Sequence, residues 1–298
     1  MSSGLLSQAA RVVVVTGGIG AACSRLFAQQ GARVVVADLQ EDKGSSLATE
    51  LGSEQALFVP CDVTKEADVA AAVQAAVDRF GGLHVMLNNA GVVGGMGPIE
   101  DMSAESFSRT LDINLKGVFH GIKHAARTMR SLGSSGSIIN TSSIAGLAIS
   151  GNWASAGYAA SKSAVVALTK LAACELAPYG ITVNALAPGV TATPMIGGFF
   201  LGDPSTPAEA VEQAVMSNSP VKGRTIRAQD IAAAALFLAS EAGQAVNGHT
   251  LVVDLGTISG VTGQVPPMSQ CPPQFFDHQG LADGEKFVGL AHLQAPKT

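Results

Sequence analysis

The sequence predicts an α/β protein with a doubly wound, seven-stranded parallel sheet, a Rossmann fold, and two observations support this prediction. Short apolar runs alternate with amphipathic stretches of ten or more residues along most of the 298-residue chain. Buried parallel strands read as continuous runs of Val, Ile and Leu, and helices cover both faces of such a sheet. A hydrophobic content of 47% is enough for a sizeable core. We expect a single domain over residues 1–260 and a tail, 261–298, that docks on a neighbouring subunit or is disordered.

The strands and helices follow from this alternation. The expected strands are 11–17, 32–38, 56–63, 83–91, 136–143, 181–189 and 250–256. The expected helices are 21–31, 66–82, 106–133, 157–180 and 228–243. Residues 194–228 have Gly and Pro at both ends and a middle rich in Met and Phe. This stretch predicts either a mobile lid over an apolar ligand or a surface helical insert.

Composition excludes several classes of function. The net charge of −5 and the absence of a Lys/Arg cluster in the sequence argue against nucleic acid as a partner. The four cysteines and six histidines show no spacing typical of a zinc site, and we expect reduced thiols that act as small apolar fillers. No apolar run is long enough to cross a bilayer, and no signal-peptide pattern is present. We therefore expect a cytoplasmic protein that does not bind membranes.

The first strand, turn and helix suggest a dinucleotide site. The strand runs into Thr16-Gly17-Gly18-Ile19-Gly20, where glycines let backbone N–H groups approach phosphate oxygens. Asp38 closes the second strand, about twenty residues on, where an acid binds the adenosine ribose hydroxyls. No Arg or Lys follows it directly, which favours NAD over NADP. Alternatively, Asp38 is a turn or helix cap.

A second pattern suggests acid–base chemistry. Tyr158 and Lys162 are four residues apart, so they share one face of a helix. A tyrosine with a pKa near 10 is a poor base at pH 7, and we expect the neighbouring lysine cation, helped by a positive nicotinamide ring, to lower that pKa. Ser143, or alternatively Ser142, ends a strand and could donate a hydrogen bond to a substrate oxygen. On an exposed helix face, the same Tyr–Lys pair would have no function.

The motifs TGG-IG, CDVT, NNAG, Ser143, YAASK and PGVTATPM, in this order, resemble the short-chain dehydrogenase/reductase family over residues 8–258. The resemblance implies that Tyr158 is the catalytic acid/base and that Ser143 binds the substrate oxygen. It implies that Lys162 adjusts the pKa of Tyr158 and binds the nicotinamide ribose. It also implies that Asn114 holds a water for proton relay, and that the protein is a homotetramer. The cofactor-binding residues that it implies are Gly17, Gly18, Ile19, Gly20, Asp38, Leu39, Asp62, Val63, Asn89, Ala90, Gly91, Tyr158, Lys162, Pro188, Gly189, Val190 and Thr193.

The glycine turn departs from the family pattern TGxxxGxG, because about three residues are missing between Gly18 and Ile19. Such a turn would offer fewer N–H donors to a pyrophosphate. Either the protein binds its cofactor poorly or these residues have been omitted from the sequence. We favour omission, because the other cofactor motifs are intact.

The substrate side has an apolar lining. Its candidate residues are Gly95, Met96, Trp153, Met195 and Phe199. A lining without a charged anchor suits a hydrophobic alcohol or ketone. Since similar plant enzymes handle terpenoid alcohols, steroids and lignans, we expect NAD-dependent oxidation of an apolar secondary alcohol such as borneol. The alternatives are a ketoreductase acting on a steroid or acyl-carrier substrate, and a non-catalytic nucleotide-binding scaffold.

Overall fold

The computed structural model describes residues 7–8, 11–17, 19–148, 155–217 and 219–259. Its centre is a seven-stranded parallel sheet with the strand order β3-β2-β1-β4-β5-β6-β9. The strands are β1 Val12–Thr16, β2 Arg33–Asp38, β3 Ala56–Pro60, β4 Val85–Asn88, β5 Gly136–Thr141, β6 Ile181–Pro188 and β9 Thr250–Val253. The doubly wound fold predicted from the sequence is therefore confirmed, and it forms one domain. The predicted tail, 261–298, lies outside the described residues.

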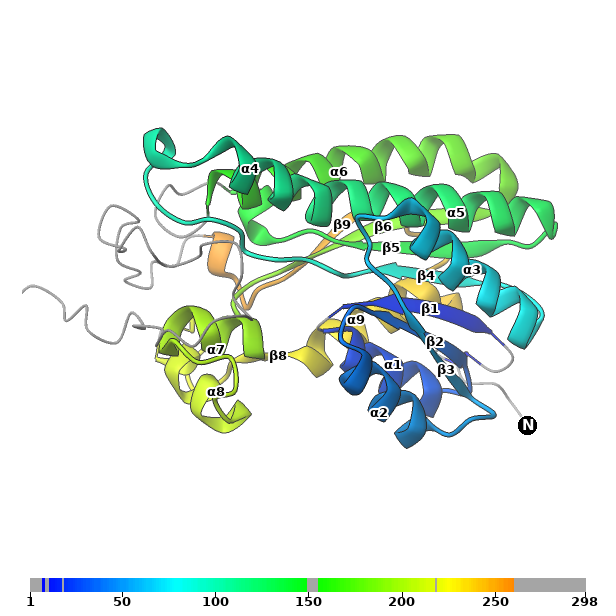
Figure 1. Ribbon diagram of the computed structural model, residues 1–298, viewed down its shortest axis with the longest axis horizontal. Coiled ribbons are helices and arrows are strands. Elements are labelled where there is room, and N and C mark those ends of the chain that lie inside the picture. Colours follow the sequence, from blue (N-terminus) through cyan, green and yellow to red (C-terminus); the bar gives the residue numbers. More distant parts are fainter. Residues whose placement is uncertain (1–6, 9–10, 18, 149–154, 218, 260–298) are drawn as a thin grey trace, which may run out of the picture.

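Helices cover both faces of the sheet (Figure 1). One face carries α1 Gly20–Gln29, α2 Glu41–Leu51 and α9 Ala228–Ala239. The other carries α3 Glu66–Phe80, α5 Gly117–Ser131 and α6 Ala156–Leu176, with α4 Ala104–Leu111 preceding α5. Each face has its own apolar core, and alternate residues of the same strand face opposite cores: Val12 and Val14 on one side, Val13 and Val15 on the other. This alternation explains why a buried parallel strand is apolar at every position.

The sheet order creates a crevice. Strand β1 lies between β2 and β4, so the connections leave β1 and β4 toward opposite faces. Ligands of such sheets bind outside the carboxyl ends of the strands at this switch point. The residues that follow β1 and β4 are therefore the first place to look for a site.

One predicted helix is divided. The stretch 106–133 reads as a single helix in sequence, but α4 and α5 are separated by a π-helical segment, Asp112–Lys116. Such single-turn π segments are frequent at functional sites. Asn114 is at the centre of this one and is fully buried.

Helix α2 was absent from the sequence prediction. Only Gly44 and Leu47 of its 11 residues are buried, so the chain carries almost no apolar stripe there. Two acidic residues in its first turn, Glu41 and Asp42, complement the positive end of the helix dipole.

The stretch 194–228 contains α7 Pro194–Leu201 and α8 Ala208–Met216, which matches the helical-insert interpretation. Its base is a two-stranded parallel sheet, in which β7 Thr191–Ala192 pairs with β8 Ile226–Arg227. Whether the insert moves as a lid stays a prediction.

The remaining short 3₁₀ segments are Ile99–Asp101, Ile144–Gly146, Ala177–Tyr179, Glu241–Gly243 and Thr257–Ser259. Among the described helices, none combines the length and the apolar character needed to cross a membrane. Cys23 and Cys61 are buried, but Cys174 is exposed on α6, so the expectation of a filler role is wrong for this one cysteine.

Candidate active site

The crevice at the carboxyl ends of β1 and β4 is held together by Thr16. Its hydroxyl accepts hydrogen bonds from the N–H groups of Asn89, at 2.9 Å, and Ala90, at 3.0 Å. The side-chain amide of Asn89 donates to the Thr16 carbonyl at 2.9 Å. Gly17 has a φ of +72°, and a Cβ on it would lie 2.6 Å from the Cα of Ala90. The glycine turn and the Asn89–Gly91 segment therefore pack too closely for any other residue at position 17.

The shortened turn still closes into a helix. The Gly20 N–H donates to the Gly17 carbonyl at 2.8 Å, and α1 begins at Gly20. Ile19 is the N-cap and supplies no side-chain hydrogen bond, and the Ala22 N–H donates to the Ile19 carbonyl at 3.1 Å. Gly18 lies outside the described residues. The predicted contacts of this turn with a cofactor stay a prediction.

The position of Asp38 in the sequence suggests either a ribose contact or a turn cap, and one of its carboxylate oxygens acts as a turn cap. One carboxylate oxygen accepts the Gln40 N–H at 2.9 Å and so caps the turn. The second oxygen has no hydrogen-bond partner among the described residues, so it is available to a ribose hydroxyl. Leu39 beside it is 69% exposed.

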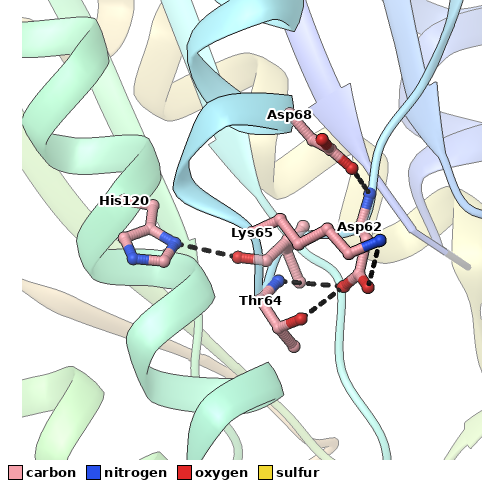
Figure 2. A network of polar contacts seen from close by, with 6 residues as sticks. Asp62, Thr64, Lys65, Asp68 and His120 are labelled. Atoms are coloured by element: carbon pink, nitrogen blue, oxygen red, sulfur yellow. Dashed lines mark hydrogen bonds and ion pairs between the residues drawn. The ribbon is translucent and has the colours of Figure 1, made fainter.

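Asp62 and Val63 lie at the end of β3 in a network of polar contacts (Figure 2). One oxygen of Asp62 accepts from the Thr64 N–H at 3.0 Å and from its hydroxyl at 2.7 Å, while the Lys65 ammonium is 3.8 Å from the other. The Val63 carbonyl is 2.9 Å from Nδ1 of His120, which is buried on α5. These contacts hold the segment in place at the crevice. Among the described residues, the second carboxylate oxygen of Asp62 has only the exposed Lys65 ammonium as a partner.

A buried row of polar side chains links the sheet to α6. The Asn88 amide donates to Asn140 Oδ1 at 2.9 Å, and the Asn140 amide donates to Thr169 Oγ1 at 2.9 Å. A Cβ on Gly121 of α5 would overlap the side-chain amide of Asn88. This row ties β4, β5 and α6 together directly behind the crevice.

The residues predicted to be catalytic converge at the end of β5. Lys162 is 3% exposed, and its ammonium donates to the Thr141 carbonyl at 2.8 Å. The same nitrogen is 5.7 Å from the ring centroid of Tyr158, one turn earlier in α6. Ser143 forms a side-chain hydrogen bond with Tyr158. A Cβ on Gly91 would lie 3.1 Å from Asn114 Oδ1 and 3.4 Å from the Lys162 nitrogen, so the chain passes close to both side chains here.

Burial governs the titration of both groups. It lowers the pKa of Lys162 from 10.5 to about 8. It raises the pKa of Tyr158, and the hydrogen bond from Ser143 offsets part of that rise. In the chain without a cofactor, desolvation of the phenolate outweighs the Ser143 hydrogen bond, so the net direction for the pKa of Tyr158 is upward. The predicted lowering of this pKa by Lys162 together with a positive nicotinamide ring stays a prediction.

The choice between the two serines follows from their partners. Ser142 is 1% exposed and donates to the Lys162 carbonyl at 2.7 Å, so its hydroxyl is already used for packing. Ser143 accepts the Ala145 N–H at 3.2 Å and keeps its hydroxyl proton for Tyr158 or a substrate. This geometry favours Ser143.

Asn114 uses its side chain on the protein itself. Its Oδ1 accepts the Val92 N–H and its Nδ2 donates to the Val92 carbonyl, both at 2.8 Å. Nδ2 also lies 3.2 Å from Oγ of Ser161. A relay water held by Asn114 would therefore bind its main chain, and the predicted relay role stays a prediction.

The segment after β6 forms the opposite wall. The Gly189 N–H donates to the Val253 carbonyl at 2.9 Å, which keeps the end of the segment beside β9. Thr193 caps α7 by accepting the Ile196 N–H at 3.4 Å. Pro188, Gly189, Val190 and Thr193 thus lie on one short stretch between the end of β6 and the start of α7, and their nicotinamide contacts stay a prediction.

The predicted substrate residues differ in exposure. Met96 and Phe199 are buried, at 8% and 7% exposure, whereas Met195 is 42% exposed and Gly95 is half-buried. A Cβ on Gly95 would overlap the Ser106 hydroxyl. Trp153 lies outside the described residues.

The histidines have structural partners. His84 Nδ1 accepts the Val12 N–H at 3.1 Å, and burial lowers the pKa of its ring. His124 and Lys123 both contact Glu66, whose pKa falls to about 2 through these two hydrogen bonds. Within the described ranges, no group of three or more metal-ligating side chains is present.

Sequence reasoning missed the polar residues that hold the site. Thr16, Thr141, Ser155 and Ser161 all bond backbone or side chains within it. The available signal was a polar residue at the carboxyl end of an apolar strand, and a serine three residues before the tyrosine, which is the spacing of a helix N-cap.

Comparison with known proteins agrees with this geometry. The profile of a family described as enoyl-(acyl carrier protein) reductase matches residues 13–257. Momilactone A synthase of Oryza sativa subsp. japonica is 48% identical over 254 residues, 83% of this chain and 89% of that protein. The mitochondrial borneol dehydrogenase of Lavandula x intermedia is 44% identical over 250 residues, 83% of this chain and 90% of that protein.

Solved structures share the fold. A short-chain type dehydrogenase/reductase from Mycobacterium marinum has a TM-score of 0.75 at 31% identity and covers 90% of this chain and 98% of that chain. Levodione reductase has a TM-score of 0.74 at 36% identity and covers 84% of this chain and 98% of that chain. Members of this family are oxidoreductases with nicotinamide cofactors. From the matched span, the relatives and the converging Ser143, Tyr158 and Lys162, the chain belongs to the short-chain dehydrogenase/reductase family.

Proposed function

We propose that this protein is an NAD-dependent dehydrogenase that oxidises a hydrophobic secondary alcohol to the ketone, with a monoterpenol such as borneol as the first substrate to test. The observation that carries the proposal is the placement of Tyr158, Ser143 and the buried Lys162 ammonium together at the end of β5. The Lavandula relative is named for borneol, and the candidate substrate lining is apolar.

The residues at the crevice fit a dinucleotide. Gly17 and Gly20 leave no room for a Cβ, and the N-cap of α1 carries no side-chain hydrogen bond, so the positive end of the helix dipole would face a phosphate. The free oxygen of Asp38 would accept from the adenosine ribose. No cation follows Asp38 directly to hold a 2′-phosphate, and its own charge repels one, so NAD is preferred over NADP.

The other half of the cofactor would lie against Asn89–Gly91 and against the connection after β6. Residues 188–190 and Thr193 would hold the nicotinamide carboxamide, and the Lys162 ammonium would bond the adjoining ribose. When bound, NAD supplies the hydride acceptor and a positive ring. A positive ring beside Tyr158 would favour its phenolate form.

The chain's own residues would handle the alcohol proton. Ser143 would donate to the alcohol oxygen and fix its position, while Tyr158 would accept the alcohol proton as the hydride leaves. Lys162 would stabilise the phenolate and, through its ribose contact, set the distance between the phenol and the reacting carbon. An apolar lining excludes water and strengthens each of these interactions.

The test is a turnover assay with NAD and a panel of terpenols, steroids and simple secondary alcohols, read as NADH absorbance. The proposal expects activity with NAD above that with NADP, and with apolar cyclic alcohols above small polar ones. Activity restricted to ketone reduction would favour the ketoreductase alternative.

The shortened glycine turn favours a second candidate, a nucleotide-binding scaffold without turnover. Here NAD would bind, as followed by calorimetry, while no alcohol or ketone in the panel reacts. The intact mass of the purified protein decides separately whether the three residues that the family pattern predicts are absent.

We also propose a homotetramer assembled through α5, α6 and the last strand. A groove of about 830 Å³ runs between α5 and α6, and three large hydrophobic side chains in it are exposed: Phe119, Leu171 and Tyr179. Three cations at helical spacing on α5, Lys123, Arg127 and Arg130, lie in the same groove with Glu175. A cytoplasmic location stays a prediction, to be tested by cell fractionation, since the Lavandula relative is named as mitochondrial.

A further inference from the structure

Ser155 joins two parts of the site that are far apart in sequence. It is the N-cap of α6, and its hydroxyl oxygen accepts the Tyr158 N–H at 3.1 Å. The same hydroxyl donates its proton to the Val93 carbonyl at 2.9 Å. Ser155 is 1% exposed, so water does not compete for either bond.

The loop that Ser155 reaches, residues 91–97, follows β4 and contains the candidate substrate residues Gly95 and Met96. Asn114 holds Val92 through two hydrogen bonds, and Ser155 holds Val93 beside it. The loop is therefore fastened at two consecutive residues, once to the π-helical segment and once to α6.

These bonds form a closed ring around the first turn of α6. The Tyr158 carbonyl accepts a hydrogen bond from the Ser161 hydroxyl, and the Ser161 oxygen accepts one from the Asn114 side-chain amide. Asn114 holds Val92, its neighbour Val93 accepts from Ser155, and Ser155 accepts from the Tyr158 N–H. The backbone of the catalytic tyrosine is bound on both its N–H and its carbonyl side by this ring.

Packing supports the same arrangement. A Cβ on Gly94 would overlap the Thr110 side chain, and a Cβ on Gly157 would lie 3.2 Å from Thr110 Cβ. The loop and the first turn of α6 thus rest on one side chain of α4.

We propose that Ser155 is a positioning residue that couples the substrate-side loop 91–97 to Tyr158, so that seating an alcohol against the loop sets the tyrosine hydroxyl at its oxygen. The role requires a side chain that accepts and donates at once, which a hydroxyl does and a carboxylate cap does not. This inference rests on the proposed function for its kinetic consequence, but the coupling itself is a property of the chain alone.

The experiment compares Ser155→Ala, Ser155→Gly and Ser155→Thr with the parent protein. Threonine keeps the hydroxyl and so both hydrogen bonds, to the Tyr158 N–H and to the Val93 carbonyl. Glycine and alanine lose both of these side-chain bonds, but glycine at an N-cap costs the helix only a little stability. Ser103→Ala is the matched control, because Ser103 caps α4 by the same bond, to the Ser106 N–H at 3.1 Å, and is exposed.

The first readout is hydrogen exchange, which needs no turnover. Peptides covering 91–97 should exchange faster in the alanine and glycine variants than in the parent, and at the parent's rate in the threonine and Ser103→Ala variants. Unchanged exchange in both the alanine and glycine variants would overturn the coupling, whether or not the protein proves to be a dehydrogenase.

The second readout is the pH profile of kcat/KM with the best alcohol of the panel. In the glycine variant kcat/KM should fall about 10- to 100-fold, since a small misplacement of a reacting group has effects of this size. The part of the pH profile that reports ionisation of Tyr158 should move to higher pH. The reason is that a displaced Tyr158 has a weaker hydrogen bond from Ser143, which lowers its pKa. A glycine variant with the parent's profile and kcat/KM would overturn the kinetic role. Absence of turnover in the parent would count against the proposed function alone.

Discussion

Lys162 carries a charge where water is nearly excluded, and this sets the chemistry of the site at the residue scale. Its Nζ has a single hydrogen-bond partner among the described residues, the Thr141 carbonyl. Burial lowers its pKa to about 8, so it is still mostly protonated at pH 7. Its remaining N–H groups are available to Tyr158 and a ribose.

Tyr158→Phe should abolish alcohol turnover and leave NAD affinity nearly unchanged. The substitution removes the hydroxyl that accepts the proton, while the ring and the Lys162 contact with Thr141 stay. Initial rates and calorimetric titration with NAD measure the two effects. An equal loss of both would contradict the role assigned to Tyr158.

Lys162→Met should abolish turnover yet raise the free energy of unfolding at pH 7, on the order of 2 kcal/mol, because it removes a desolvated charge. The sign follows from the lowered pKa: between about 8 and 10.5 the unfolded chain binds more protons, so the parent gains stability as pH rises. The difference in free energy of unfolding between Lys162→Met and the parent should therefore become smaller as the pH rises from about 8 to 10.5. Urea unfolding at pH 7 and pH 9.5 measures it, and a constant difference would show that the ammonium is not desolvated.

At the scale of elements, close contacts decide what the sequence can tolerate. Gly121 of α5 lies directly over Asn88 of β4, and Asn88 starts the polar row through Asn140 to α6. Glycine in a helix interior usually costs stability. At position 121, however, glycine lets α5 pack against β4, because a Cβ there would overlap the Asn88 side chain.

Gly121→Ala should lower the free energy of unfolding by about 2 kcal/mol, although alanine favours helix, because the new methyl group displaces the Asn88 amide from its partner. The control is Gly198→Ala in α7, where the added Cβ would make only an ordinary contact, 3.5 Å from Pro204. That variant should be as stable as the parent or more so. Thermal and urea unfolding measure both, and a stabilised Gly121→Ala protein would contradict the geometry.

The elements that the sequence predicted well are those with a strong apolar pattern. All seven strands of the main sheet were predicted from their apolar runs, although the edge strands β3 and β9 are mostly only half-buried. The Tyr–Lys spacing alone placed the pair on one helix face. Helix α2 was missed because it buries only two residues, and the π segment was missed because its backbone change leaves the apolar pattern continuous. The polar ring around Tyr158 depends on contacts between distant residues, which no local pattern records.

At the scale of the whole molecule, the groove between α5 and α6 is the surface that a monomer would leave exposed. Phe119, Leu171 and Tyr179 are each 46% exposed or more, and charges of both signs lie beside them. A self-complementary interface needs both apolar area and opposite charges.

Leu171→Glu should convert the proposed tetramer to smaller species without unfolding the protomer, because a carboxylate would be buried at the proposed contact. Ile99→Glu is the control, since Ile99 is 76% exposed and lies outside the groove. Light scattering coupled to gel filtration measures the mass. A parent protein at the monomer mass would contradict the assembly.

The pairing of β7 with β8 has a consequence for how this molecule could be altered. Thr191 faces Ile226 and Ala192 faces Arg227, so the chain leaves the main body and returns to it at adjacent points. Arg227 also bonds Glu212 of α8 at 2.8 Å, which fastens the excursion to its own base. A segment with matching ends and a different interior could be exchanged here as a cassette. Under the proposed function, the exchange would change which alcohols are admitted while the sheet, Ser143, Tyr158 and Lys162 keep their places.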